Sequence, residues 1–199
     1  MLSQDEQKPE KKLTNKQSLV LYLHDIVYLL CAMMVVLLLI FRVVVVSGTS
    51  MNMTLLDGDY LLLLSNTIYH KPRAGDIIVV SKDSFDDGAA FVKRVIATEG
   101  QTVDIDFETG TVRVDGVVLE EDYINAPTTV SGGVKFPLTV EQGCVFAMGD
   151  NRGISKDSRY PDIGQIDTRE ILGKALYLVY PGTHEGTTAR DFSRIGAVN

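Results

Sequence analysis

The sequence predicts a mainly β protein with a single transmembrane helix near its N-terminal end. One observation is an apolar stretch that runs from Ile26 to Phe41 without a charged residue and continues past Arg42 through Val43–Val46. The other is the remainder of the chain, where short runs rich in Val, Ile, Leu, Tyr or Phe alternate with turn residues. We therefore expect one helix followed by one extracytoplasmic β domain.

The apolar stretch has the length of a membrane anchor. As a helix, Ile26–Val46 would span about 32 Å, and the hydrocarbon core of a bilayer is about 30 Å thick. A cleaved secretory signal fits less well, because its apolar region is usually only roughly 7–15 residues long. A buried core helix would carry a polar face, which this stretch lacks. We predict a transmembrane helix over 23–44, with the alternative that the four valines begin a strand, since β-branched runs favour strands.

The charges before the helix predict its orientation. Four lysines precede it, and the positive-inside rule places such residues in the cytoplasm. Residues 1–22 are then a cytoplasmic tail, of which 1–17 are polar enough to be disordered. Residues 45–199 form the extracytoplasmic domain of a single-pass protein of the cytoplasmic membrane.

The charge balance limits the possible partners. The chain has a net charge of −7, and residues 1–46 hold five Lys or Arg against four Asp or Glu, so the outer part carries −8. An acidic domain is not expected to bind nucleic acid or to adhere broadly to anionic lipid. Membrane contact should rest on the helix and on exposed apolar residues. The three histidines are scattered, so we expect no metal site and no cofactor.

The outer part is predicted to form short strands throughout. About 150 residues follow the helix, which is enough for one core. The expected strands are Tyr60–Ser65, Asp76–Ser81, Ala90–Ala97, Thr102–Asp106, Thr111–Asp115, Val117–Glu120, Gly143–Met148 and Ile171–Tyr180. Asp115-Gly116 between two apolar runs indicates a hairpin. Residues 101–143 should contain a small insert lobe, and the polar residues 181–199 are expected to fray.

Ser50 is the first candidate for chemistry, because it lies only four residues past the apolar stretch. A serine hydroxyl needs a base to act as a nucleophile. His70 is the only histidine placed plausibly for a triad. Lys93 lies in the otherwise apolar run 89–97, where burial would lower its pKa towards neutrality. From the pattern alone, the favoured interpretation is that Lys93 and Arg94 are ordinary solvated strand residues.

A polar segment from Gly149 to Arg159 follows the apolar run Cys144–Met148 directly. It contains two serines, two aspartates and two arginines. A polar loop at the end of a strand often carries function. This one could supply a hydroxyl that orients a lysine, and Asp–Arg pairs that hold the loop. A solvated surface turn is the alternative.

Together these segments resemble those of bacterial type I signal peptidases, the membrane-bound serine proteases that remove signal peptides from exported proteins. Residues 47–55 resemble the nucleophile box, Gly75–Val79 the Gly-Asp strand box, and 91–96 the lysine box. Gly149–Arg159 matches the last box, Gly-Asp-Asn-Arg-x-x-Ser-x-Asp-Ser-Arg, at every fixed position. The resemblance runs from the helix to about Pro181. It implies an antiparallel β-sheet or β-barrel-like catalytic domain, and the short insert suggests the compact, Gram-positive-like form with a small β lobe.

The resemblance implies the catalytic roles. Ser50 would be the nucleophile that forms an acyl-enzyme, and Lys93 the general base. The Ser50 N–H would be one oxyanion donor. Gly48 occupies the position from which some relatives supply a second donor through a serine, so a backbone or different donor is needed here. Met53 stands where the family usually has proline, which leaves this turn more flexible.

The last box would supply the supporting residues. Ser155 would hydrogen-bond to the lysine amine and orient it. Asp157 and Arg159 would form a supporting ion pair. Asp150 and Arg152 would shape the same loop.

The resemblance also implies the substrate. It would be the signal peptide of an exported preprotein with an Ala-x-Ala-like cleavage site, delivered by the secretion machinery at the lipid bilayer. The peptide would pair as an added strand between the strand before Ser50 and the strand of Lys93. The residues expected to line its pockets are Val45, Ser47, Ala90, Phe91 and Val92.

Three other classes share parts of this pattern. A membrane-anchored pilus-assembly factor could keep the fold without proteolysis, but intact Ser50, Lys93 and Ser155 argue against it. A self-cleaving repressor or mutagenesis-type protease would be cytosolic, which the apolar stretch contradicts. A penicillin-binding-type enzyme needs Ser-x-x-Lys, and Met53 stands at that spacing.

Overall fold

The computed structural model describes residues 15–82, 85, 88–183 and 186–198. The chain forms two compact units, residues 1–38 and residues 39–199. The first unit holds most of one long helix, and the second holds all the strands.

The helix α1 spans Asn15–Ile40. Its portion Ser18–Ile40 has 23 residues and is long and apolar enough to cross a membrane; at 1.5 Å per residue it is roughly 35 Å long. Strand β1, Phe41–Val45, begins at the next residue and pairs with a neighbour in which Leu62 lies opposite Val43. Val43–Val45 therefore belong to a strand, which was the alternative to a helix that continues to residue 44, and Val46 follows the strand.

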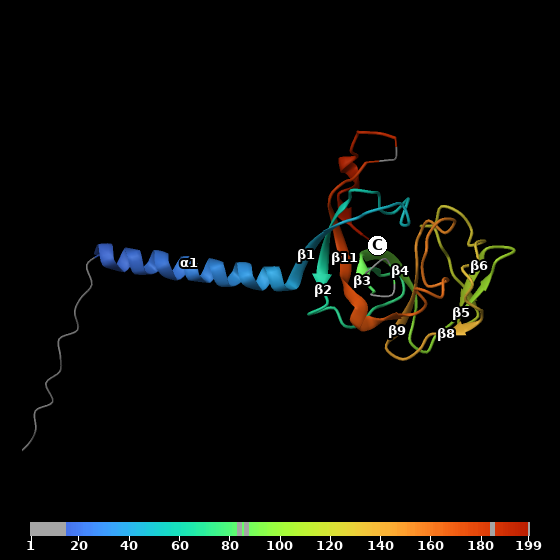
Figure 1. Ribbon diagram of the computed structural model, residues 1–199. Coiled ribbons are helices and arrows are strands. Elements are labelled where there is room, and N and C mark those ends of the chain that lie inside the picture. The colour runs from blue at the N-terminus through green and yellow to red at the C-terminus, as the bar shows by residue number, and fades with distance from the viewer. Residues whose placement is uncertain (1–14, 83–84, 86–87, 184–185, 199) are drawn as a thin grey trace, which may run out of the picture. The chain divides into compact units, whose positions relative to one another are not determined.

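The larger sheet has eight strands, all paired antiparallel, in the order β1-β2-β11-β3-β4-β9-β10, with β12 also paired to β11 (Figure 1). Besides β1, its strands are β2 Tyr60–Ser65, β3 Ile77–Ser81, β4 Ala90–Thr98, β9 Cys144–Met148, β10 Ile166–Asp167, β11 Ile171–Tyr180 and β12 Gly196–Ala197. The predicted mainly β fold is confirmed, and the runs at β2 and β11 match their predicted bounds. The two-residue strands β10 and β12 were not predicted.

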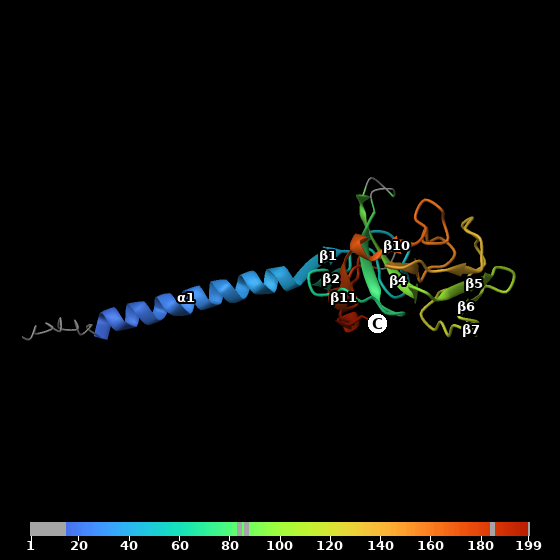
Figure 2. The same ribbon diagram turned by 90° about the horizontal axis from the view of Figure 1, so that it is seen from below.

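The smaller sheet forms the predicted lobe. Its order is β7-β6-β5-β8, with β5 Thr102–Asp106, β6 Thr111–Val114, β7 Val117–Val118 and β8 Leu138–Thr139. Asp115 and Gly116 form the turn between β6 and β7 and both have positive φ, 52° and 79°, as a tight hairpin turn requires. In both views this sheet lies at the end of the second unit opposite β1 and β2 (Figure 2).

The larger sheet is packed on both faces. Along β3, Ile77 and Val79 join one core cluster, whereas Ile78 and Val80 join another. This follows from the alternation of side chains along a strand. A third cluster around Phe146 lies between β9 and the lobe strands. Apolar burial on both faces makes β3 and β4 rigid supports for polar groups, because core side chains pack at near-crystalline density.

The described residues of the segment after β11 do not fray as expected. β12 pairs with β11, so that Gly196 lies opposite Leu178. The N–H of Val198 donates to the carbonyl oxygen of Leu176 at 3.0 Å, and the Val198 side chain is buried in the first core cluster. The expectation rested on the polar composition of this segment. It was wrong because β11 extends past β3 and leaves an edge with which β12 pairs.

Candidate active site

Lys93 lies in the middle of the larger sheet and is only 3% exposed. On β4 it is opposite Ile78 of β3, so its stem leaves the strand among apolar side chains. Its amine donates to Ser50 Oγ at 2.8 Å and to the Val92 carbonyl oxygen at 3.0 Å. The solvated alternative is therefore wrong for Lys93.

Burial lowers the pKa of Lys93 to about 8, because an ammonium loses its hydration there. The Asp157 and Asp150 carboxylates raise the pKa and so act against this effect, while the Arg159 guanidinium lowers it further. Desolvation is the largest of these effects. The amine is therefore a much better proton acceptor near neutral pH than an exposed lysine.

Both aspartates near Lys93 are held by arginines. Arg94 donates to the two Asp150 oxygens at 2.9 and 2.8 Å, and Arg159 donates to the two Asp157 oxygens at 2.8 and 2.9 Å. All four side chains are buried, and bidentate contacts of this kind are strong and well oriented. Asp157 and Arg159 thus form the expected pair, whereas Asp150 pairs with Arg94 of β4.

The loop 149–159 also binds the backbone around the serine. The Asn151 N–H donates to the Ser50 carbonyl oxygen at 3.0 Å, and the Asn151 side-chain amide donates to the Thr49 carbonyl oxygen at 3.0 Å. Gly149 lies so close that a Cβ there would overlap Ser155 Oγ and lie 2.5 Å from the Ser50 carbonyl oxygen. The glycine at the start of the box is therefore needed for the close approach of the two segments.

The Ser155 hydroxyl is buried beside Gly149. Within the described part of the chain, its oxygen has no hydrogen-bond partner. A buried hydroxyl in this state gains free energy from any donor or acceptor that reaches it. Its action on the Lys93 amine stays a prediction.

Arg152 points into the lobe rather than towards Asp150. It donates to both Glu121 oxygens, at 3.0 and 2.5 Å, and to Thr128 Oγ1 at 2.7 Å. The Arg94 guanidinium carbon lies over the Tyr123 ring, 4.0 Å from the ring centre. The lobe thus supports the loop 149–159 through the contacts of Glu121 and Thr128 with Arg152. The sequence offered no signal for Glu121, which is 31 residues away from its partner.

Some residues of the turn around the serine hold it in place and others do not; Met51, for example, is buried in the first core cluster. Gly48 has φ +87°, and its N–H donates to Asp57 Oδ1 at 2.8 Å. That N–H, a candidate oxyanion donor, is therefore engaged elsewhere. Met53 is 74% exposed, so its side chain does not hold the turn. The neighbouring Thr54 does, because its hydroxyl donates to Asp150 at 2.6 Å.

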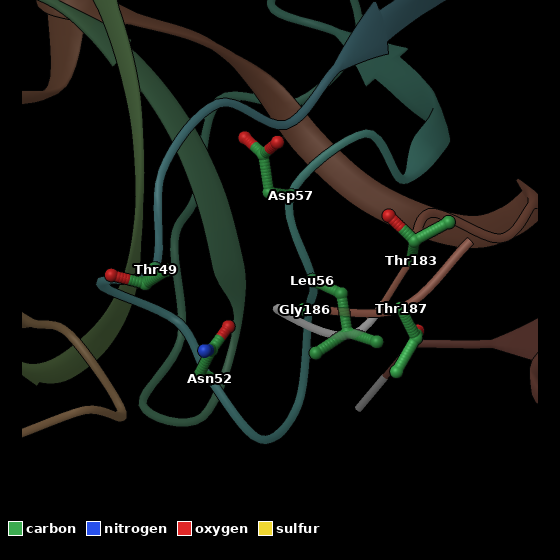
Figure 3. Close-up of a pocket in the computed structure, with 7 residues that line it drawn as sticks. All are labelled: Thr49, Asn52, Leu56, Asp57, Thr183, Gly186 and Thr187. Atoms are coloured by element: carbon green, nitrogen blue, oxygen red, sulfur yellow. The ribbon is translucent and has the colours of Figure 1, made fainter. Parts of the chain in front are cut away.

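A pocket of about 480 Å³ lies beside this turn and is lined by two chain segments (Figure 3). Thr49, Asn52, Leu56 and Asp57 come from the segment around Ser50, and Thr183, Gly186 and Thr187 come from the segment after β11. Neither Ser50 nor Lys93 lines it. The segment after β11 therefore lies alongside the segment that carries the serine.

The predicted peptide-binding residues lie on β1 and β4, except for Ser47, which is exposed just past β1. Val45 and Ala90 are exposed, Phe91 is half-buried, and Val92 packs into the first core cluster. β9 pairs with β4 only from Arg94 onwards. Among the described residues, no strand pairs with the edge of β4 at 90–93 on that side.

The fold and the site define a serine peptidase, in which a serine hydroxyl contacts a buried lysine amine in a β domain. The family model described as signal peptidase, peptidase S26, matches residues 19–180. This match covers most of the chain, and the chain therefore belongs to the signal peptidase family.

Two sequence relatives agree with this assignment. A probable signal peptidase I-1 from Synechocystis sp. is 37% identical over 81% of this chain and 84% of its own length. The signal peptidase I of Bacillus licheniformis is 32% identical over 86% of this chain and 95% of its own length. A crystal structure of a signal peptidase I from Enterococcus faecalis is 32% identical, covers 52% of this chain and 96% of its own, and has a TM-score of 0.43.

The close approach at Gly149 generates a prediction. We expect Gly149→Ala to lower the turnover number (kcat) for preprotein cleavage by about 100-fold, because the new methyl group would displace Ser50 and Ser155 from each other. Steady-state kinetics on the purified full-length protein in detergent would measure the loss.

Gly153→Ala is the matched control. Gly153 is exposed in the same loop, and nothing lies within 4 Å of a Cβ built there. Equal activity of the two variants would contradict the close contact at Gly149.

Proposed function

We propose that the protein is a membrane-anchored endopeptidase that removes signal peptides from exported preproteins, with Ser50 as nucleophile and Lys93 as general base. The observation that carries the proposal is the 2.8 Å contact between Ser50 Oγ and an amine that is 3% exposed. A serine nucleophile needs a base at hydrogen-bond distance, and a desolvated lysine can act as one near neutral pH.

The proposed reaction has two stages. The neutral Lys93 amine accepts the Ser50 hydroxyl proton as Oγ attacks the scissile carbonyl carbon. The C–N bond then breaks, the Lys93 ammonium returns the proton to the leaving amine, and the signal peptide remains as an ester on Ser50. Water, deprotonated by the same amine, hydrolyses that ester. The Ser50 N–H would stabilise the oxyanion in both stages.

The free edge of β4 suggests how the signal peptide would bind. An extended peptide could add to this edge at 90–93 through backbone hydrogen bonds, next to Lys93. Val45, Ser47, Ala90 and Phe91 would then contact its side chains, and Val92 would contribute through its backbone. Shallow apolar pockets of this kind favour the small residues of an Ala-x-Ala site.

The chemistry would take place at the outer surface of the cytoplasmic membrane. α1 supplies a span of sufficient length, and the lysines before it favour a cytoplasmic N-terminus. Exposed aromatic residues of the second unit, Tyr60, Tyr180 and Phe192, contact one another edge to face. Such side chains are suited to the lipid headgroup region, where the secretion machinery would release its preproteins.

The central test removes each reacting group. We expect Ser50→Ala and Lys93→Ala each to abolish cleavage of a preprotein, because one lacks the nucleophile and the other lacks the base. Cleavage would be followed by gel shift with the full-length enzyme in vesicles or detergent.

The matched controls are Ser131→Ala and Lys135→Ala, which remove the same groups from exposed positions in the lobe. Both should keep wild-type activity. Full activity of Ser50→Ala or of Lys93→Ala, with the protein still folded, would refute the proposed pair.

The lowered pKa of Lys93 predicts the pH dependence. Only the neutral amine accepts the serine proton, so kcat/KM should rise with pH through a midpoint near 8 and be lost as the pH falls below it. Asp157 raises this pKa. Asp157→Asn should therefore move the midpoint to lower pH, and a pH–rate profile of each protein would measure it. An unchanged or higher midpoint in the variant would contradict the assignment of Lys93 as the titrating group.

The proposed peptide site predicts a change of specificity. Ala90 is exposed on the free edge of β4. Ala90→Leu should fill a shallow pocket and shift the residues accepted before the cleaved bond, as measured by sequencing the products of a preprotein library. Val117→Leu, at an exposed position in the lobe, is the control. Identical cleavage profiles for wild type and Ala90→Leu would count against this site.

A further inference from the structure

The segment that carries Ser50 ends at a buried carboxylate, which accepts four hydrogen bonds. Asp59 is fully buried. Its oxygens accept from the Leu56 N–H at 2.7 Å, from the Gly182 N–H at 2.6 Å and from the two terminal nitrogens of Arg194 at 2.9 and 2.7 Å. Asp59 thus joins the nucleophile loop, residues 47–59, to the segment after β11.

Arg194 contacts the nucleophile loop directly as well. Its guanidinium donates to the Thr54 carbonyl oxygen at 3.3 Å, four residues past Ser50. The Thr54 hydroxyl in turn donates to Asp150, the carboxylate paired with Arg94. The loop is therefore held on one side by the box that contains Ser155 and on the other by Arg194.

The local structure keeps Arg194 in place. It ends a single 3-10 turn, Phe192–Arg194, whose first residues are capped by the Asp191 carboxylate. β12 begins two residues later and pairs with β11. Gly182 is equally constrained, because a Cβ there would overlap the Asp57 carbonyl oxygen. Figure 3 shows the same juxtaposition, with Thr183 and Thr187 across from Leu56 and Asp57.

Core packing and the backbone also hold this part of the loop: Met51 and Leu55 are buried in the first core cluster, and the Leu55 N–H donates to the Met51 carbonyl oxygen at 2.9 Å. By contrast, the Met53 side chain is 74% exposed. A nucleophile displaced by about 1 Å can lose about 100-fold in rate. The contacts of Arg194 reach Thr54 and Asp59 in the same loop, so they can affect the position of Ser50. The family match ends at residue 180, so this arginine lies outside it.

We propose that Arg194 is a positioning residue for the nucleophile: by holding Asp59 and the Thr54 carbonyl, it fixes the loop that presents Ser50 to Lys93. This inference rests on the proposed role of Ser50. The hydrogen bonds of Arg194 to the loop go to Asp59 and the Thr54 carbonyl, not to Ser50 or Lys93, so it would act through the loop. The segment after β11 is then a functional part of the active site rather than a terminal extension.

The test compares two arginines of the same segment in the full-length protein. Arg194→Ala should lower kcat for preprotein cleavage roughly tenfold to 100-fold. KM should change by less than about twofold, because the peptide site on β4 is untouched. The midpoint of the pH profile should stay near 8, because the burial of Lys93 does not change. Arg190→Ala is the control, since Arg190 donates to the Pro181 carbonyl oxygen and stacks on Tyr180 without reaching the loop.

Chemical rescue separates positioning from general destabilisation. Arg194 is 17% exposed, so a small cation can enter its place. Guanidinium chloride at millimolar concentration should restore part of the kcat of Arg194→Ala and leave Arg190→Ala unchanged. If Arg194→Ala does not fold, Arg194→Lys serves instead; its single ammonium cannot bind both Asp59 oxygens and the Thr54 carbonyl, so kcat should still fall.

Several outcomes would overturn the inference. They are wild-type kcat in the Arg194 variant that folds, an equal loss in Arg190→Ala, or a loss that appears only in KM. Ser50→Ala is assayed in parallel. If it is inactive while the Arg194 variant is fully active, only the positioning role fails; if Ser50→Ala is active, the proposed function itself fails.

Discussion

The active site depends on a lysine amine that is buried while the nearby carboxylates are held by arginines. Asp150 and Asp157 lie close enough to Lys93 to raise its pKa, yet each is bound through both oxygens by Arg94 or Arg159. A carboxylate released from its arginine would favour the ammonium more strongly. Because the arginines hold both carboxylates, desolvation remains the largest influence on the pKa of Lys93.

Arginines also connect the separate parts of the second unit. Arg94 belongs to β4 and reaches the loop 149–159, whereas Arg152 leaves that loop and reaches Glu121 in the lobe. On the far side of the serine, Arg194 reaches Asp59. The nucleophile loop is held by its own turns and by the buried side chains of Met51 and Leu55, and contacts from β4, the loop 149–159 and Arg194 add to these. Removing one partner of such a buried pair would leave an uncompensated charge, which is far more costly than losing a surface ion pair.

Patterns of local origin were predicted well. The periodicity of β2 and β11 and the Asp-Gly turn between β6 and β7 depend on neighbouring residues, and the structure confirms them. The two-residue strands β10 and β12 were missed, because they form only where a longer strand leaves an open edge. The valines at β1 were ambiguous for a related reason: a β-branched run suits either a membrane helix or a strand, and pairing with β2 decides for the strand.

The sequence by itself determined the long apolar helix, the β character of the rest and the four motifs in order, because these are properties of adjacent residues. It also pointed to Ser50 and Lys93, although the pattern around Lys93 by itself favoured a solvated strand residue. Only the tertiary structure decided that Lys93 is buried against Ser50, that Arg94 rather than Arg152 pairs with Asp150, and that the last residues close onto the nucleophile loop through Arg194. Burial and ion pairing depend on which distant segments meet, and no local pattern contains that information.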